Sequence, residues 1–150
     1  MAKSLKSLYE SDFFEWTART AELLRHGDIH QIDREHVAEE IEDMGKRDRR
    51  EAISKTAVLI AHLLKWCIQP EQRQYAAASW QETIRRERRE IPLICEDSPS
   101  LERFIRENLD GRIYRLALRI AAEDTGSDLK RFPKACPFIF EQVLDSGFLP

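Results

Sequence analysis

The chain has 150 residues, a usual size for one globular domain, and 42% of them are hydrophobic, enough to form a buried core. Charged residues make up 34% of the chain, whereas Gly and Pro number only 5 and 6, so exposed helices are favoured over a sheet with many turns. The net charge of −3 provides no overall basic field that would attract nucleic acid or anionic lipid.

Three further features predict the compartment. No apolar run approaches the roughly 18–20 residues that span a bilayer, so we expect no membrane segment. The N-terminal residues lack the apolar stretch and cleavage site of a secretory signal. The three cysteines lie far apart in the sequence, which argues against a disulfide framework. We therefore expect a cytoplasmic protein.

The first predicted helix begins after Asp12, whose carboxylate can cap the first turn, with Glu15 three residues later completing a box-like pattern. Apolar residues then recur at helical spacing up to Gly27, which can end a helix in the left-handed conformation. We therefore expect a helix over about 13–26.

The next element starts at the candidate cap Asp33 and has two alternative forms. An apolar face recurs at helical spacing at Val37, Ile41 and Met44. After a charged stretch, the apolar stripe resumes over 53–67. Either one long helix covers 34–68, or two helices meet at Gly45. Because Gly costs about 1 kcal/mol in a helix interior, we favour a bend or break at Gly45.

Proline and glycine divide the second half of the chain. A helix is predicted over 71–96, which Pro92 should kink or shorten because its ring clashes with an earlier carbonyl. Ser98-Pro99 is a typical helix start, a capping serine followed by proline at the first position. That helix should end near Gly126, with a bend at Gly111.

Pro137 can open a last short helix that runs through Leu144, and no stretch of useful length shows the alternation of a strand. The predicted fold class is all-α. We expect a single-domain helical bundle over 1–150, with four to five main helices and a short C-terminal helix.

Catalytic and cofactor signatures are missing from the sequence. It contains no glycine-rich nucleotide loop, no nucleophile elbow and no zinc-protease motif. The Glu-x-x-His pattern of di-iron bundles is also absent. The sequence predicts no cofactor and leaves open whether the protein is an enzyme.

An acidic stretch of the second element could bind a divalent metal. His36 and Glu40 lie four residues apart on one helical face, next to Glu39. If the chain reversed at Gly45, His62 could join them in a His/Glu/His set of ligands. The alternative, which we favour, is a solvated helix face together with a hydrogen-bonded His62 among apolar neighbours.

Arginines cluster on the predicted helix 71–96, at Arg85, Arg86, Arg88 and Arg89. Such a cluster could contact nucleic-acid phosphates, because the guanidinium matches phosphate oxygens. Glutamates alternate with these arginines, a pattern more typical of an exposed helix with internal ion pairs. Nucleic-acid binding is therefore the less favoured interpretation.

Several short motifs together resemble one family. They are Glu39–Gly45, His62–Trp66, Gln69-Pro70, Trp80–Ile84, Ser98–Leu101, Ala121–Glu123, and Phe132-Pro133 with Cys136–Phe138. Over Leu8–Pro150 the chain resembles a bacterial family named "domain of unknown function 29". The resemblance implies a non-secreted helical bundle and implies no activity and no site residues.

These observations favour a non-enzymatic helical module that binds another protein or itself through an apolar or acidic helix face. Metal binding through His36, Glu39, Glu40 and His62 is the first alternative. Nucleic-acid binding through the arginines of 85–89 is the second.

Overall fold

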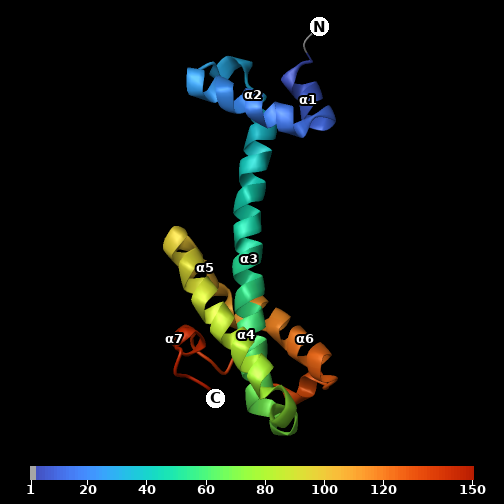
Figure 1. The fold of residues 1–150 in the computed structure, drawn as a ribbon, viewed down its shortest axis with the longest axis vertical. Coiled ribbons are helices and arrows are strands. Elements are labelled where there is room, and N and C mark those ends of the chain that lie inside the picture. The colour runs from blue at the N-terminus through green and yellow to red at the C-terminus, as the bar shows by residue number, and fades with distance from the viewer. Residues whose placement is uncertain (1–2) are drawn as a thin grey trace. The chain divides into compact units, whose positions relative to one another are not determined.

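The computed structural model describes residues 3–150, and its regular structure in that range is entirely helical (Figure 1). The chain forms two compact units: unit 1 extends to Arg47, and unit 2 is Asp48–Pro150. The predicted all-α class and the short C-terminal helix are confirmed. No helix within residues 3–150 is both long enough and apolar enough to cross a membrane. That the two units form a single domain stays a prediction.

Unit 1 contains α1 (Leu5–Ser11), α2 (Phe13–His26), the short 3₁₀ helix η1 (Ile29–Gln31) and the first part of α3 (Arg34–Ile68). The predicted cap is confirmed, since Asp12 Oδ1 accepts a hydrogen bond from the Glu15 amide at 3.1 Å. Gly27 ends α2 with φ of 82°, a conformation that glycine adopts without a steric penalty.

α3 is one continuous helix of 35 residues. The predicted interruption at Gly45 is wrong, and the alternative of one helix over 34–68 is confirmed. A single glycine lowers helix stability by about 1 kcal/mol without preventing the helix, and the Glu, Met, Lys and Arg residues around it are good helix formers. The chain turns instead at Gln69, after which Pro70 occupies the first position of the next helix.

The next two helices meet at Ser98. α4 (Pro70–Asp97) continues through Pro92, so of the two predicted effects, a kink or a shorter helix, the second does not occur. α5 (Pro99–Asn108) begins at the predicted proline, but the Ser98 side chain makes no capping hydrogen bond.

The helix is kinked at Gly111, as predicted: the backbone of Gly111 leaves helical values within the π-helical turn η2 (Leu109–Ile113). α6 (Tyr114–Thr125) follows and ends at Gly126, with φ of 64°. After the 3₁₀ helix η3 (Leu129–Arg131), the last helix is α7 (Phe140–Leu144). It starts later than predicted because Ile139 is its cap residue, and the Ile139 amide donates to Gln142 Oε1 at 3.1 Å.

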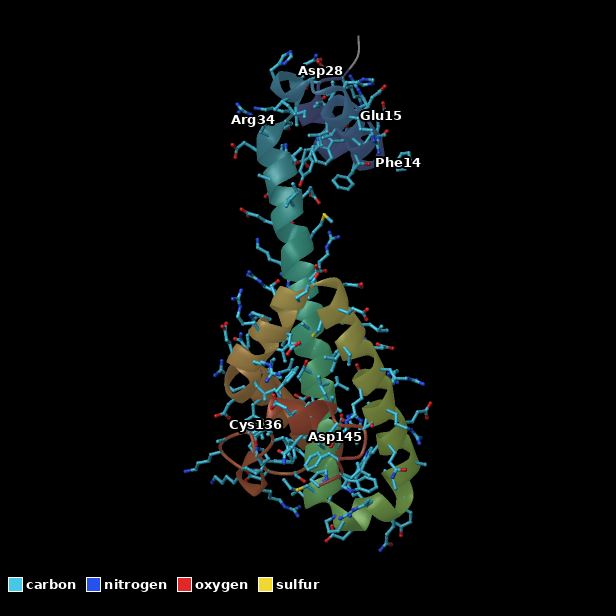
Figure 2. All side chains as sticks on the ribbon, turned by 90° about the vertical axis from the view of Figure 1, so that its left-hand side faces the viewer. Phe14, Glu15, Asp28, Arg34, Cys136 and Asp145 are labelled. Atoms are coloured by element: carbon cyan, nitrogen blue, oxygen red, sulfur yellow. The ribbon has the colours of Figure 1, made fainter. Side chains whose placement is uncertain are left out.

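The core of unit 2 forms where the C-terminal part of α3 runs between α4 and α6 (Figures 1 and 2). Its largest fully buried apolar side chains include Leu59, Ile60, Leu63, Leu64, Ile91, Ile105, Ile113 and Val143. Each such burial stabilises the fold by about 1.5–3 kcal/mol, so truncating Leu63 to alanine would cost about 2–5 kcal/mol.

Candidate functional site

Tyr9 connects α1 to the start of α3 within unit 1. Its hydroxyl donates to Glu40 Oε1 at 2.7 Å. Its ring stacks on the His36 imidazole, with 3.8 Å between the ring centroids and 19° between the planes. The hydrogen bond to Glu40 favours the neutral phenol and raises the pKa of Tyr9 to about 12. These contacts fix one face of the α3 segment that the sequence marked as a candidate metal site.

His36 is also held from the N-terminal end of α3. Its Nδ1 lies 2.5 Å from Oδ2 of the buried Asp33. Because a carboxylate only accepts, Nδ1 carries the proton, and Nε2 makes no hydrogen bond within residues 3–150. Asp33 precedes α3 as predicted, and its carboxylate orients the His36 imidazole.

Three of the four predicted metal ligands belong to unit 1, and the fourth, His62, belongs to unit 2. In unit 1, Glu39 is exposed, Glu40 binds Tyr9 and His36 binds Asp33. In unit 2, His62 has its own partners, described next. In the part of the chain that the structure describes, no group of three or more His, Cys, Asp or Glu side chains could hold a metal ion. The metal site stays a prediction.

His62 belongs to a polar cluster of unit 2. Its Nδ1 donates to the Val58 carbonyl at 2.8 Å, and its Nε2 lies 3.2 Å from Nζ of the buried Lys65. Lys65 also donates to Asp124 Oδ2 at 2.8 Å, so its charge is paired. Burial lowers the pKa of His62, and the positive charge of Lys65 adds to that effect. The cluster attaches the end of α3 to the end of α6, which is a structural role.

Within residues 3–150, two of the four predicted nucleic-acid arginines are exposed and have no partner. Arg88 is buried and donates to the carbonyls of Val143 and Gln142, at 2.8 and 3.2 Å. Arg86 pairs with Glu87 at 3.1 Å. Arg85 and Arg89 are exposed on α4. Arg88 therefore attaches α7 to α4, and phosphate binding by this set stays a prediction.

One surface of α3 in unit 1 is apolar and exposed. Ile41 and Met44 are three residues apart, hence on one helix face, and are 63% and 61% exposed. Beside them lies Gly45, where an added Cβ would meet no atom within 4 Å beyond its chain neighbours and the local helix backbone. Glu40 and Arg47, seven residues apart, share one flank of this face. We name these five residues the 40–47 surface.

Two phenylalanines at the start of α2 extend the exposed apolar area of unit 1. Phe13 lies beside Tyr9, with 5.8 Å between the ring centroids, and so lies near the Glu40 flank. Phe14 is 82% exposed and points outward from α2 (Figure 2). The sequence showed these apolar residues, but it could not show that Phe14 stays almost fully exposed and Phe13 half exposed.

Comparison with known proteins agrees with the motifs. The family model described as "Domain of unknown function DUF29" matches residues 8–149. The chain belongs to this family. No curated protein and no solved structure matches it significantly.

Membership of DUF29 confirms the resemblance of the motifs and assigns no chemistry to the chain. In this DUF29 chain, the motif residues Lys65 and Gln69 both bind α6 or its end: Lys65 pairs with Asp124, and Gln69 Nε2 donates to Ser127 Oγ at 2.7 Å. The motif around His62 therefore maintains the fold. In the 40–47 surface, Glu40 binds Tyr9, whereas Ile41, Met44 and Arg47 make no side-chain hydrogen bond or ion pair within residues 3–150.

Proposed function

We propose that this DUF29 chain is a non-enzymatic interaction module that pairs with a second copy of itself through the 40–47 surface. The observation that carries the proposal is Gly45. A glycine in an exposed helix interior costs about 1 kcal/mol, and nothing in unit 1 lies close enough to exclude a larger residue. A contact outside the chain would explain it, because a missing side chain lets another helix approach closely.

The charges of the surface are complementary to themselves. In a two-fold dimer each patch meets its own copy, so residue i contacts j while j contacts i. If two α3 helices pair antiparallel across Ile41 and Met44, the acidic Glu40 of one copy faces the basic Arg47 of the other, twice. Glu40 Oε2 is open to such a pair, since the Tyr9 bond uses Oε1.

The area that the dimer requires also fits unit 1. A stable interface buries about 800 Å² on each partner, more than two apolar side chains provide. Phe13 and Phe14 lie on the same unit and are 47% and 82% exposed, so a partner resting on Ile41 and Met44 can extend onto α2. We place this dimer in a reducing cytoplasm, in keeping with three cysteines that are all free thiols.

Sedimentation velocity tests the apolar part of the surface. We expect the native protein to sediment as a dimer, and Ile41→Lys to weaken the dimer at least about tenfold, because a buried lysine would have no partner. The matched control is Leu129→Lys, a residue of unit 2 that is 56% exposed and should leave the dimer unchanged. A native protein that stays monomeric at about 100 μM would refute the proposal.

Charge exchange tests the antiparallel arrangement. Glu40→Lys and Arg47→Glu should each weaken the dimer, while the double variant should restore it, since the pair is reformed with opposite polarity. Tyr9→Phe is the control for the first change, because it removes the Tyr9–Glu40 bond and leaves the charge of Glu40. Failure of the double variant to recover would contradict the Glu40–Arg47 contact.

A further inference from the structure

Unit 2 carries a hollow of about 340 Å³ whose charged lining residues are all arginines. Arg50 and Ile53 of α3 form one side, and Arg112 of η2 and Arg115, Leu116 and Arg119 of α6 form the other. The three arginines that follow Gly111 stand at positions i, i+3 and i+7, which places them along one helical face. Positive charge from two segments distant in sequence therefore gathers at one place.

These four arginines differ from the paired arginines of unit 2, and unlike Arg85 and Arg89 on α4 they share one hollow. Elsewhere in the unit, Arg106 pairs with Glu102 and Glu141, and Arg86 pairs with Glu87. Within residues 3–150, none of the four guanidinium groups of the hollow makes an ion pair or a hydrogen bond, and all four side chains are exposed. Asp110, an acid just before Arg112 in the chain, accepts the Cys136 amide at 2.6 Å.

Four like charges around one hollow repel each other, and an anion bound between them removes that repulsion. Arginine presents a planar fork of donors that matches phosphate oxygens, so a phosphate group is the anion that this lining suits best. Four guanidinium groups offer more donors than the oxygens of one phosphate can accept, which points to two or more adjacent phosphates. The apolar Ile53 and Leu116 offer a surface for an uncharged part of the same ligand.

We propose that this hollow binds a small organic polyphosphate, a molecule with two or more linked phosphates on a flat or apolar body. The volume lies within the range of about 300–1,000 Å³ that small-molecule sites occupy. A nucleic acid would need a basic path beyond the hollow. Unit 2 holds 17 basic and 16 acidic residues, so its charge outside the hollow is not basic.

Calorimetric titration of the full chain with ATP, inorganic tripolyphosphate and inorganic phosphate, in magnesium-free buffer, tests the site. ATP and tripolyphosphate should bind, and ATP more tightly, because its base contacts the apolar lining. Inorganic phosphate should bind at least about tenfold more weakly than tripolyphosphate, since it engages fewer arginines. Equal affinity for ATP and tripolyphosphate would overturn the assignment of the apolar lining, and no binding of ATP at about 1 mM would overturn the site.

Two double variants with the same loss of charge locate the binding. Arg115→Gln with Arg119→Gln should weaken ATP at least about tenfold, whereas Arg85→Gln with Arg89→Gln on α4 should change it less than about twofold. Equal losses of ATP affinity in both double variants would show an effect of net charge and overturn the proposal. The proposal would also be overturned if an oligonucleotide bound more tightly than ATP and its binding depended on Arg115 and Arg119. Unchanged helical circular dichroism must accompany each result, and Arg112→Lys provides a milder variant if the first pair fails to fold.

Discussion

Tyr9 of α1 contacts two side chains of α3 in unit 1. It stacks on an imidazole that Asp33 holds in place, and it donates to the carboxylate of Glu40. Both partners belong to α3, so one side chain fixes α1 against two successive turns of that helix. The hydrogen bond and the raised pKa of Tyr9 are two expressions of the same contact, because the neutral phenol is the form that donates.

Alkaline titration should report this contact. The pKa of Tyr9 rises from the ordinary 10.0 to about 12, so its contribution to stability is complete below pH 10.0 and is lost as the pH rises through about 12. We expect the tyrosinate absorbance of the native protein, minus that of Tyr9→Phe, to have its midpoint near 12. A difference curve centred near 10.0 would mean that Tyr9 does not donate to Glu40.

His62 should make unit 2 sensitive to acid. Burial lowers the pKa of His62 below the ordinary 6.5, so the unfolded chain binds more protons than the folded one as the pH falls. The His62 contribution is therefore complete above pH 6.5 and is lost as the pH falls through the lower folded pKa. Thermal unfolding between about pH 7.5 and about pH 5 should show this loss.

His62→Gln should flatten that dependence, because glutamine does not titrate. His26→Gln is the matched control, since the His26 side chain is 69% exposed and belongs to unit 1. If His26→Gln flattened the profile as much as His62→Gln does, the acid sensitivity would not arise from the cluster around Lys65.

At the scale of elements, α3 is one uninterrupted helix although Gly45 lowers its stability locally. Gly45 weakens the helix but does not end it, and the residues on both sides remain helical. The cost would be offset if the exposed face contacts another helix, as the proposed dimer requires. Replacing Gly45 should therefore raise the stability of the folded chain and weaken its self-association.

Gly45→Ala tests this opposition. Alanine should stabilise α3 by about 1 kcal/mol, since no atom within 4 Å would clash with its Cβ. The same methyl group should weaken the dimer by separating the two helices. Chemical denaturation of monomeric protein at low concentration measures the first effect, and sedimentation measures the second. A variant that is stabilised and dimerises as tightly as the native protein would refute the close approach at Gly45.

The sequence predicted the elements where the signal is local. Asp12 and Gly27 bound α2 as expected, and Pro99 opens α5, because capping chemistry depends on a few neighbouring residues. The path through Gly45 was predicted wrongly, since a local penalty competes there with the propensity of a long helix. The stacking of Tyr9 on His36 could not be predicted, because it depends on how α1 packs in unit 1.

At the scale of the whole molecule, the two units differ in size and in charge. Unit 1 holds 11 acidic and 7 basic residues, for a net charge of −4, and its buried apolar residues are few, chiefly Leu8 and Trp16. The buried Trp16 Nε1 has no hydrogen-bond partner within residues 3–150, which lowers the gain from burying it. Unit 2 has the larger core. Unit 1 should therefore be the less stable part.

Trp16→Ala should unfold unit 1 and spare unit 2. Truncating a buried tryptophan costs about 3–5 kcal/mol, which is a large share of the free energy of unfolding of a small unit. We expect the pKa of Tyr9 to return to about 10.0, while thermal unfolding of unit 2, followed by Trp66 and Trp80 fluorescence, keeps its midpoint and its dependence on His62. A single transition that moves as a whole would show that the units unfold together.

The turn at Leu109–Ile113 sets the rotational phase of α6. One residue more or less in a helix rotates everything after it by about 100°, because an α-helix has 3.6 residues per turn. α6 uses two faces at once: Ala117 and Ala121 face the core, while Arg115 and Arg119 face the hollow. A chain lacking Gly111 could still form both flanking helices, yet the apolar face would leave the core and the arginines would leave Arg50. The length of this turn is therefore as strictly constrained as the residues it positions.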